Sequence, residues 1–252
     1  MRGGVLLSVR EKSTRLPGKV IAPVHGKNVT SQLVARLQMA RLPEQVVIAT
    51  SDDPRHGVFD GIGRECGVAV FHGSQDDKLL RYRDACRAFE WDFAVVVDGD
   101  DLLCFPEFID RAIEHFRANP GFDAVFTRGL PLGAAASLLS RSALDKVVEL
   151  KAEADTEVWG GYFIGSGHFN VGFLEAEAPF RRPEVRMTLD YQEDMDFFLT
   201  IFDELYPSNP RFSSRDVMEL LERRPDIVGM NAVAQAKYEG HISGAAPVRF
   251  KS

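Results

Sequence analysis

Residues 9–19 combine cationic and hydroxyl side chains in a pattern suited to binding a polyanion. This segment, VREKSTRLPGK, directly follows the apolar run at residues 5–7. Its hydroxyls belong to Ser13 and Thr14, and its cations are Arg10, Lys12, Arg15 and Lys19. Cationic side chains neutralise phosphate groups, and loop amides bind phosphate oxygens. A solvated basic loop is the alternative, because charge density alone does not distinguish the two.

Two common phosphate-binding motifs are absent from this segment. Gly18-Lys19 is followed by Val20, and Ser13 stands where a P-loop would have its first glycine. A GxGxxG motif is also missing here. The position of the loop nevertheless favours a ligand site, because it lies at the first strand-to-loop junction of an apparent α/β chain. The sequence has no clear nucleophile motif, which favours direct displacement chemistry.

Three carboxylates follow the apolar run at residues 95–97: Asp98, Asp100 and Asp101. Clustered carboxylates repel one another unless a cation is present, so a hard metal ion such as Mg²⁺ is a natural partner. Asp98 or Asp101 alone can equally cap a helix or a turn. All three acting only as turn residues is the less favoured alternative.

A further carboxylate, Asp190, lies in the segment TLDYQEDMD at residues 188–196. Asp190 is a candidate N-cap of the helix that follows, with Glu193 closing a capping box three residues later. A capping role would leave the other carboxylate oxygen able to bind a ligand, so a structural and a binding role are compatible.

The apolar pattern predicts strands that alternate with helices. The predicted strands are Val5–Val9, Val46–Thr50, Val68–Phe71, Ala94–Asp98 and Ala124–Thr127. The predicted helices are Ser31–Arg41, Gly57–Cys66, Leu79–Phe89, Phe105–Ala118, Gln192–Leu205 and Ser214–Arg223. This alternation indicates βαβ units and an α/β fold with a mostly parallel sheet.

Residues 129–186 show a looser pattern and are rich in glycine and aromatic residues. We predict one domain over residues 1–252, with 129–186 as a small inserted lobe that binds an acceptor, forms a dimer, or both. Exposed aromatic side chains at Trp159, Tyr162 and Phe163 would suit a symmetric homodimer.

Composition favours a cytoplasmic enzyme. The net charge of −7 and the isoelectric point of about 5.4 argue against nucleic acid or an anionic membrane as the main partner. The three cysteines are too few and too scattered for a disulfide framework. No apolar run approaches the roughly 20 residues of a membrane span, and the N-terminal segment does not resemble a signal peptide.

Several motifs together resemble those of the CMP-sugar synthetases, the cytidylyltransferases that act on sialic acid, deoxy-octulosonate and related sugars. The similarity is greatest to the spore-coat polysaccharide subgroup. It rests on RxxSTRLPGK at residues 10–19 and on ATSDD at 49–53, FHGSQDD at 71–77, Arg81-Tyr82, Gly99-Asp100, GLPLG at 129–133, RMTLD at 186–190 and Asn231-Ala232. Because the motifs follow the family's order, the resemblance spans nearly the whole chain.

The resemblance implies a Rossmann-like nucleotide-diphospho-sugar transferase fold, with helices flanking a mixed sheet. It also implies that an acceptor oxygen attacks the α-phosphorus of CTP and releases pyrophosphate. The implied catalytic residues are Lys19, Arg10 and Asp100. The implied metal ligands for Mg²⁺ are Asp100 and Asp190, whereas Asp98 replaces a commonly uncharged residue and has an open role. The implied nucleotide-binding residues are Arg10, Ser13, Thr14, Arg15, Lys19, Ser74, Asp77 and Arg81.

The expected acceptor is a small anionic molecule, a nonulosonate or related sugar acid used for surface glycans. The family usually carries acidic residues after GLPxG, whereas the corresponding run here is Gly133-Ala134-Ala135-Ala136-Ser137-Leu138-Leu139, which has no acidic residue. Two alternatives therefore stay open: an enzyme acting on a phosphonate or phosphate acceptor, and a nucleotide-binding module without catalysis. The cations and carboxylates named above favour the enzyme.

Overall fold

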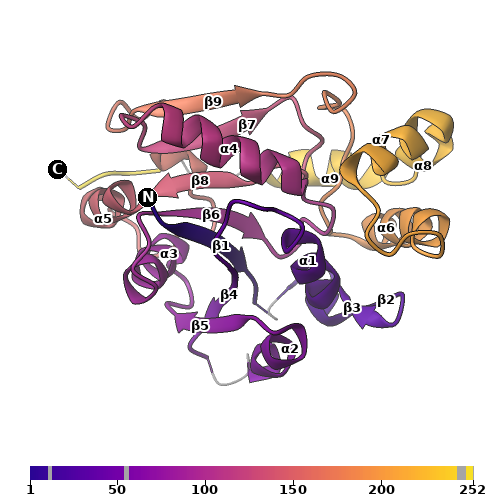
Figure 1. The fold of residues 1–252 in the computed structure, drawn as a ribbon, viewed down its shortest axis with the longest axis horizontal. Helices are drawn as coiled ribbons and strands as arrows, with labels where there is room; N and C mark the ends of the chain where they lie inside the picture. Colours follow the sequence, from indigo (N-terminus) through magenta and orange to yellow (C-terminus); the bar gives the residue numbers. More distant parts are fainter. Residues whose placement is uncertain (11–12, 54–56, 243–247, 252) are drawn as a thin grey trace.

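The computed structural model describes residues 1–10, 13–53, 57–242 and 248–251, and it is built around a seven-stranded sheet (Figure 1). The spatial order of the strands is β5-β4-β1-β6-β8-β7-β9. Their bounds are β1 Gly3–Ser8, β4 Val46–Ser51, β5 Ala69–Gly73, β6 Phe93–Asp98, β7 Ala124–Arg128, β8 Ser137–Ser140 and β9 Val171–Glu175. β8 pairs antiparallel with both neighbours, and the other pairs are parallel. The predicted α/β class with a mostly parallel mixed sheet is confirmed.

Alternating side chains of the strands build one core on each face of the sheet. In β1, Leu7 packs into the first core and Leu6 into the second. The first core also takes side chains from α1, α2 and α4, and the second from α3 and α5. The bounds of these helices are α1 Val29–Leu37, α2 Val58–Cys66, α3 Lys78–Ala88, α4 Pro106–Ala118 and α5 Arg141–Leu150. The sheet is therefore covered on both faces, as the apolar strands require.

The C-terminal helices gather beyond α1 and α4 at one end of the molecule (Figure 1). They are α6 Gln192–Leu205, α7 Ser214–Arg223, α8 Pro225–Gly229 and α9 Ala232–Ile242. Short elements complete the described part: the 3₁₀ turns at Lys19–Ile21 and Gly160–Tyr162, and the hairpin of β2 Pro23–Val24 and β3 Lys27–Asn28. Among the described helices, none combines the length and the apolar character needed to cross a bilayer.

The predicted strands correspond to β1, β4, β5, β6 and β7, and the predicted helices to α1, α2, α3, α4, α6 and α7. Helix α1 begins two residues before the predicted start, because the side chain of Asn28 accepts a hydrogen bond from the backbone N–H of Ser31 and caps it. Strands β8 and β9 and helix α5 were not predicted from the sequence.

Residues 129–186, predicted as a small inserted lobe, contribute β8 and β9 to the central sheet. The part between α5 and β9 lies against the second core. There Trp159, Tyr162 and Phe163 are 8%, 1% and 1% exposed. The expectation of exposed aromatic side chains is therefore wrong, because these rings cover α3 and α5. The homodimer itself stays a prediction.

Strands β1 and β6 lie side by side where the strand order reverses, and their loops meet at the carboxyl edge of the sheet. Ser8 at the end of β1 is paired in register with Asp98 at the end of β6. A Cβ on Gly99 would lie 2.4 Å from Cγ1 of Val9, so glycine permits this close approach of the two loops. Ligand sites of open α/β sheets form at such switch points.

One buried cation, Arg36 of α1, ties the C-terminal helices to the sheet domain. Its guanidinium donates to the carbonyl oxygens of Cys104 and Phe212 at 2.8 and 3.1 Å and to Oγ of Ser214 at 3.1 Å. Burial lowers the pKa of Arg36 to about 10, so the side chain still carries its charge at neutral pH. These bonds connect α1 with the start of α7, across the end of the molecule that also holds α6.

We expect Arg36→Met to lower the free energy of unfolding by about 2–4 kcal/mol, because it leaves buried acceptors without donors. Arg41→Met is the matched control, since Arg41 is exposed at the end of the same segment, and we expect a change within about 0.5 kcal/mol. Urea unfolding followed by circular dichroism measures both. Equal stability of the two variants would show that Arg36 does not join the helices.

Candidate active site

The ammonium of Lys19 lies between two carboxylates from distant parts of the chain. Its Nζ donates to Oδ2 of Asp100 and to Oδ1 of Asp190, at 3.0 Å each, and to the carbonyl oxygen of Leu189 at 2.5 Å. Burial by itself lowers the pKa of Lys19, but attraction to Asp100 and Asp190 outweighs it and raises the pKa above its ordinary value. Lys19 therefore carries its charge at neutral pH. Its bonds connect the loop after β1 with the loop after β6 and with the segment before α6.

The second loop cation, Arg15, also binds Asp190, at 2.6 Å from Nη2 to Oδ1. The other oxygen of Asp190 accepts from Nη2 of Arg186 at 3.1 Å. The carboxylate of Asp190, only 2% exposed, is thus surrounded by three cations. The predicted capping box of Asp190 and Glu193 is wrong, because α6 begins at Gln192 as predicted but has Tyr191 as its N-cap, and Asp194 closes the capping box.

Asp194, in the first turn of α6, orients the whole Asp190 segment and was not predicted. It is fully buried and accepts five hydrogen bonds of 2.8–3.0 Å: from Nε and Nη2 of Arg186, from the backbone N–H groups of Asp190 and Tyr191, and from Nδ2 of Asn231. The sequence offered one signal for this role. Asp194 follows Asp190 by four residues, a spacing that in a helical turn brings the side chain of Asp194 back toward Asp190.

Helix α9 lies against this same cluster. Asn231, just before it, also donates to the carbonyl oxygen of Arg186 at 3.2 Å. The guanidinium of Arg186 lies 4.8 Å from the ring centroid of Tyr238, a cation–π contact. Burial and the nearby carboxylates, Asp190 first among them, raise the pKa of Tyr238. Helix α9 and the residue before it therefore pack against Arg186 and Asp194, the two residues that orient Asp190.

The acidic cluster after β6 is compact. Carboxylate oxygens of Asp98, Asp100 and Asp101 lie within 4.8 Å of one another. Burial and the charges of Asp100 and Asp98 raise the pKa of Asp101, whereas attraction to Lys19 and Lys78 overcomes burial and lowers that of Asp100. Hard oxygen donors at this spacing fit a divalent cation. Asp100 belongs to the acidic cluster and also binds Lys19. Lys19 in turn binds Asp190, so one ammonium links the two predicted metal ligands.

A second set of ion pairs lies beside the cluster. Arg10 binds the carboxylate of Glu157, and it donates a long bond of 3.5 Å to the carbonyl oxygen of Gln75. Lys78, the first residue of α3, donates to Oδ1 of Asp98 at 2.9 Å and lies 3.3 Å from Oε1 of Glu157. Neither Lys78 nor Glu157 was predicted, because a single cation at a helix start and a single acid in a loop carry no motif.

Most of the remaining predicted nucleotide-binding residues form hydrogen bonds within the protein. Arg81 is fully buried and donates to the carbonyl oxygen of Ser74 at 3.0 Å and to Oγ of Ser8 at 3.1 Å. Asp77 caps α3 and binds Lys151. Ser74 accepts from the backbone of Asp77, Ser13 accepts from the backbone of Leu16, and Thr14 is exposed. These groups shape the loops after β1 and β5, and their contact with a nucleotide stays a prediction.

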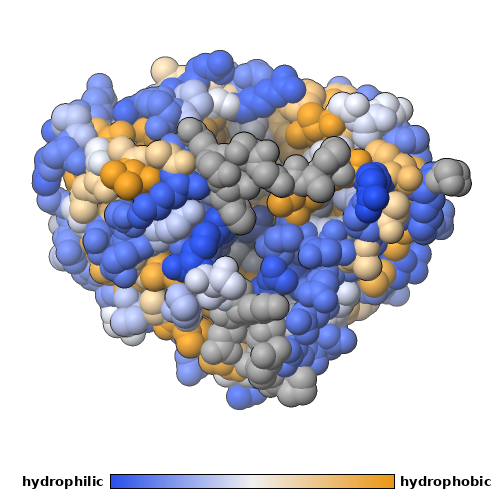
Figure 2. Space-filling model, turned by 180° about the vertical axis from the view of Figure 1, so that it is seen from behind, coloured by the Kyte–Doolittle hydropathy of each residue, from blue (hydrophilic) through white to orange (hydrophobic). Residues whose placement is uncertain are grey.

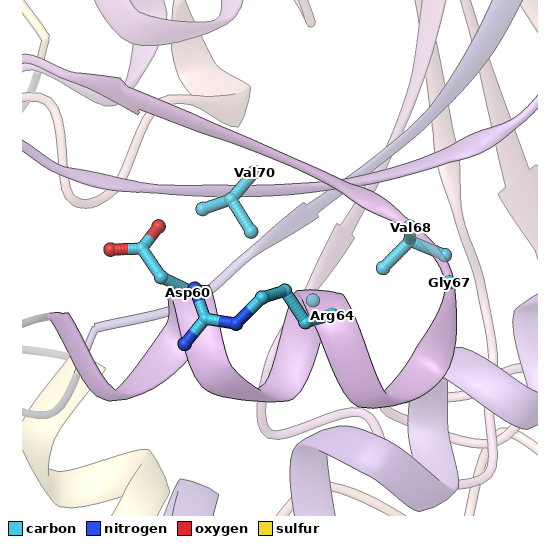
Figure 3. Close-up of a pocket in the computed structure, with 6 residues that line it drawn as sticks. Asp60, Arg64, Gly67, Val68 and Val70 are labelled. Carbon is cyan, nitrogen blue, oxygen red and sulfur yellow. The ribbon is translucent and has the colours of Figure 1, made fainter.

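A hollow of about 420 Å³ lies elsewhere, between α2 and β5 (Figure 3). Asp60 and Arg64 of α2 and Val70 of β5 line it, and none of the predicted site residues does. On the face opposite to that in Figure 1, the coloured surface is mostly hydrophilic, with apolar residues in separate patches (Figure 2).

Comparison with known proteins places this geometry in a family. The family model described as Cytidylyltransferase matches residues 5–208. The chain belongs to the cytidylyltransferase family. It is therefore a CTP-dependent nucleotidyltransferase, and the matched region holds the loop after β1, the acidic cluster and Asp190.

Individual relatives agree with this assignment. The spore coat polysaccharide biosynthesis protein SpsF of Bacillus subtilis is 28% identical over 229 residues, which are 88% of this chain and 94% of that protein. A 3-deoxy-manno-octulosonate cytidylyltransferase of Trichlorobacter lovleyi is 32% identical over 46% of this chain and 45% of its own length. The solved structure of a cytidylyltransferase from Leptospira borgpetersenii superposes with a TM-score of 0.82 at 25% identity, covering 90% of this chain and 97% of that one.

We expect Asp194→Asn to lower the free energy of unfolding by about 3–5 kcal/mol, because it leaves the buried charge of Arg186 poorly paired. Glu193→Gln is the matched control in the same helical turn, since Glu193 is exposed enough for its pair with Lys237 to contribute under about 1 kcal/mol. Chemical unfolding gives both values. A small loss for Asp194→Asn, similar to that of the control, would contradict its role as the orienting group.

Proposed function

We propose that this cytidylyltransferase transfers CMP from CTP to a sugar acid, a nonulosonate or a related compound, for the synthesis of a surface polysaccharide. The observation that carries the proposal is the placement of Lys19 between Asp100 and Asp190 at the switch point of the sheet. The names of the relatives support the class of acceptor, because SpsF acts in polysaccharide biosynthesis and the octulosonate enzymes act on a sugar acid.

In the proposed reaction, an oxygen of the acceptor forms a bond to the α-phosphorus of CTP while the bond to the pyrophosphate oxygen breaks. Lys19, Arg10 and Arg15 neutralise the triphosphate and the leaving pyrophosphate. Since the pKa of Lys19 is raised, its charge persists over the neutral and mildly alkaline range. Cζ of Arg15 lies 5.7 Å from the centroid of the Tyr191 ring. This cation–π contact helps to hold the guanidinium beside Asp190.

The carboxylate oxygens of the acidic cluster fit Mg²⁺, and we propose that Asp100 of this cluster holds the ion together with Asp190, which lies on the other side of Lys19. Bound there, the ion would neutralise charge on phosphate oxygens. Side chains of the protein hold these two carboxylates in place. Asp194 and Arg186 orient the Asp190 segment, and Lys19 binds both Asp100 and Asp190.

The proposal is tested by incubating the protein with each nucleoside triphosphate, Mg²⁺ and a panel of keto-sugar acids, and measuring pyrophosphate. We expect release with CTP and at least one sugar acid. Release only with phosphonate or phosphate acceptors would replace the proposed substrate class. A thermal shift with CTP but no turnover on any acceptor would favour a nucleotide-binding module instead.

Within that assay, we expect Lys19→Ala and Arg10→Ala to reduce kcat/KM for CTP by about 30- to 150-fold, since each loses a charge-assisted contact of about 2–3 kcal/mol. Asp100→Asn should abolish Mg²⁺-dependent turnover, because an amide carries no charge. Lys27→Ala, which removes an exposed cation from β3, is the control and should behave as the wild type. Full activity of Lys19→Ala and Arg10→Ala would remove the loop from the active site.

A further inference from the structure

The carboxylate of Glu157 binds two cations from different parts of the chain, one in the loop after β1 and one at the start of α3. Oε2 of Glu157 pairs with Nη2 of Arg10, and Oε1 lies 3.3 Å from Nζ of Lys78. Each oxygen of Glu157 thus faces one cation. A phosphate or carboxylate group of a ligand can present two oxygens to two cations in the same way.

We propose that Arg10 and Lys78 form an anion-binding pair, which Glu157 fills in the free enzyme and leaves when an anionic group of a substrate binds. The proposal rests on the proposed function for its substrates. The shared chemistry is an oxyanion, and its source is either the triphosphate of CTP or the carboxylate of a sugar acid.

The exposure of the side chains makes this exchange favourable. Glu157 is 46% exposed and Arg10 is 24% exposed, so water already screens their ion pair. A phosphate group carries more charge than a carboxylate and accepts stronger charge-assisted hydrogen bonds. An arriving phosphate group therefore gains more from the two cations than Glu157 loses, whereas a carboxylate replaces Glu157 on equal terms.

Lys78 differs from an ordinary surface lysine in being held in place. Its side chain is 9% exposed, and Oδ1 of Asp98 accepts from its Nζ at 2.9 Å. Although burial alone lowers the pKa of Lys78, Asp98 and the other nearby groups raise it above its ordinary value. When Glu157 leaves, the ammonium therefore stays charged and keeps its position beside the acidic cluster.

The backbone that carries Glu157 is anchored on both sides, so the exchange needs only a side-chain rotation. On one side, Thr156 is buried and its hydroxyl donates to Oδ1 of Asp77 at 2.9 Å. On the other side, Trp159 packs edge-on against Tyr82 in the second core, with ring centroids 6.1 Å apart. The segment thus presents Glu157 to the pair without itself moving.

Binding measurements on Glu157→Gln test the proposal. The control is Asp76→Asn, which removes the same charge nearby from a residue that binds the Glu157 segment through its backbone oxygen, at 3.1 Å from the N–H of Thr156. Isothermal titration uses CTP with Mg²⁺, pyrophosphate with Mg²⁺, and 3-deoxy-manno-octulosonate, each alone. We expect the Kd of at least one ligand to fall about fivefold in Glu157→Gln relative to the control, the factor that corresponds to a lost competing pair of about 1 kcal/mol.

The three ligands identify the source of the oxyanion. Tighter CTP and pyrophosphate binding assigns the pair to the triphosphate, and tighter binding of the sugar acid alone assigns it to the acceptor. Lys78→Met should weaken the same ligand and should shrink the effect of Glu157→Gln in the double variant, because one of the two cations is then missing.

Unchanged or weaker binding of all three ligands by Glu157→Gln would overturn the proposal and make Glu157 an orienting partner of Arg10. The proposed function is judged separately, because these titrations need no transfer of CMP. An enzyme without turnover on any sugar acid can still show the exchange, and an active enzyme can lack it.

Discussion

The site depends on one ammonium held between two carboxylates that are about ninety residues apart in sequence (Asp100 and Asp190). Like-charged carboxylates do not remain close unless a cation compensates them. Lys19 supplies that charge from a third loop. The bridge therefore joins the loop after β1, the loop after β6 and the segment before α6, and each of these depends on the other two for its electrostatic balance.

Around this bridge, the ion pairs form two linked groups with different exposure. Asp190, Asp194 and Arg186 are nearly inaccessible to water, whereas Arg10 and Glu157 are partly solvated. Buried pairs lose heavily when one partner is removed, and solvated pairs exchange partners at little cost. The buried group thus fixes the geometry of Asp190, and the solvated group can exchange one of its own partners for a ligand.

The sequence was informative where local chemistry and local structure coincide. Apolar runs predicted the parallel strands because both faces of each strand are buried. Lys19, Asp100 and Asp190 were assigned to one site by the family resemblance, and the structure brings the three side chains together. Strand β8 escaped because it is only four residues long and antiparallel. Lys78 and Glu157 escaped because their meeting depends on how residues 151–159 cross α3, which no local pattern encodes. The buried state of Trp159 escaped for the same reason.

The contacts of α9 bear on where the working enzyme ends. The family match stops at residue 208, yet Asn231 donates to Asp194 and the ring of Tyr238 covers Arg186. A chain trimmed to the matched region would leave a fully buried carboxylate short of a donor and would open a guanidinium to water. The folded unit that supports Asp190 therefore extends beyond the matched region, and sequence change in the C-terminal helix can alter the surroundings of Asp190 without altering any of the loops.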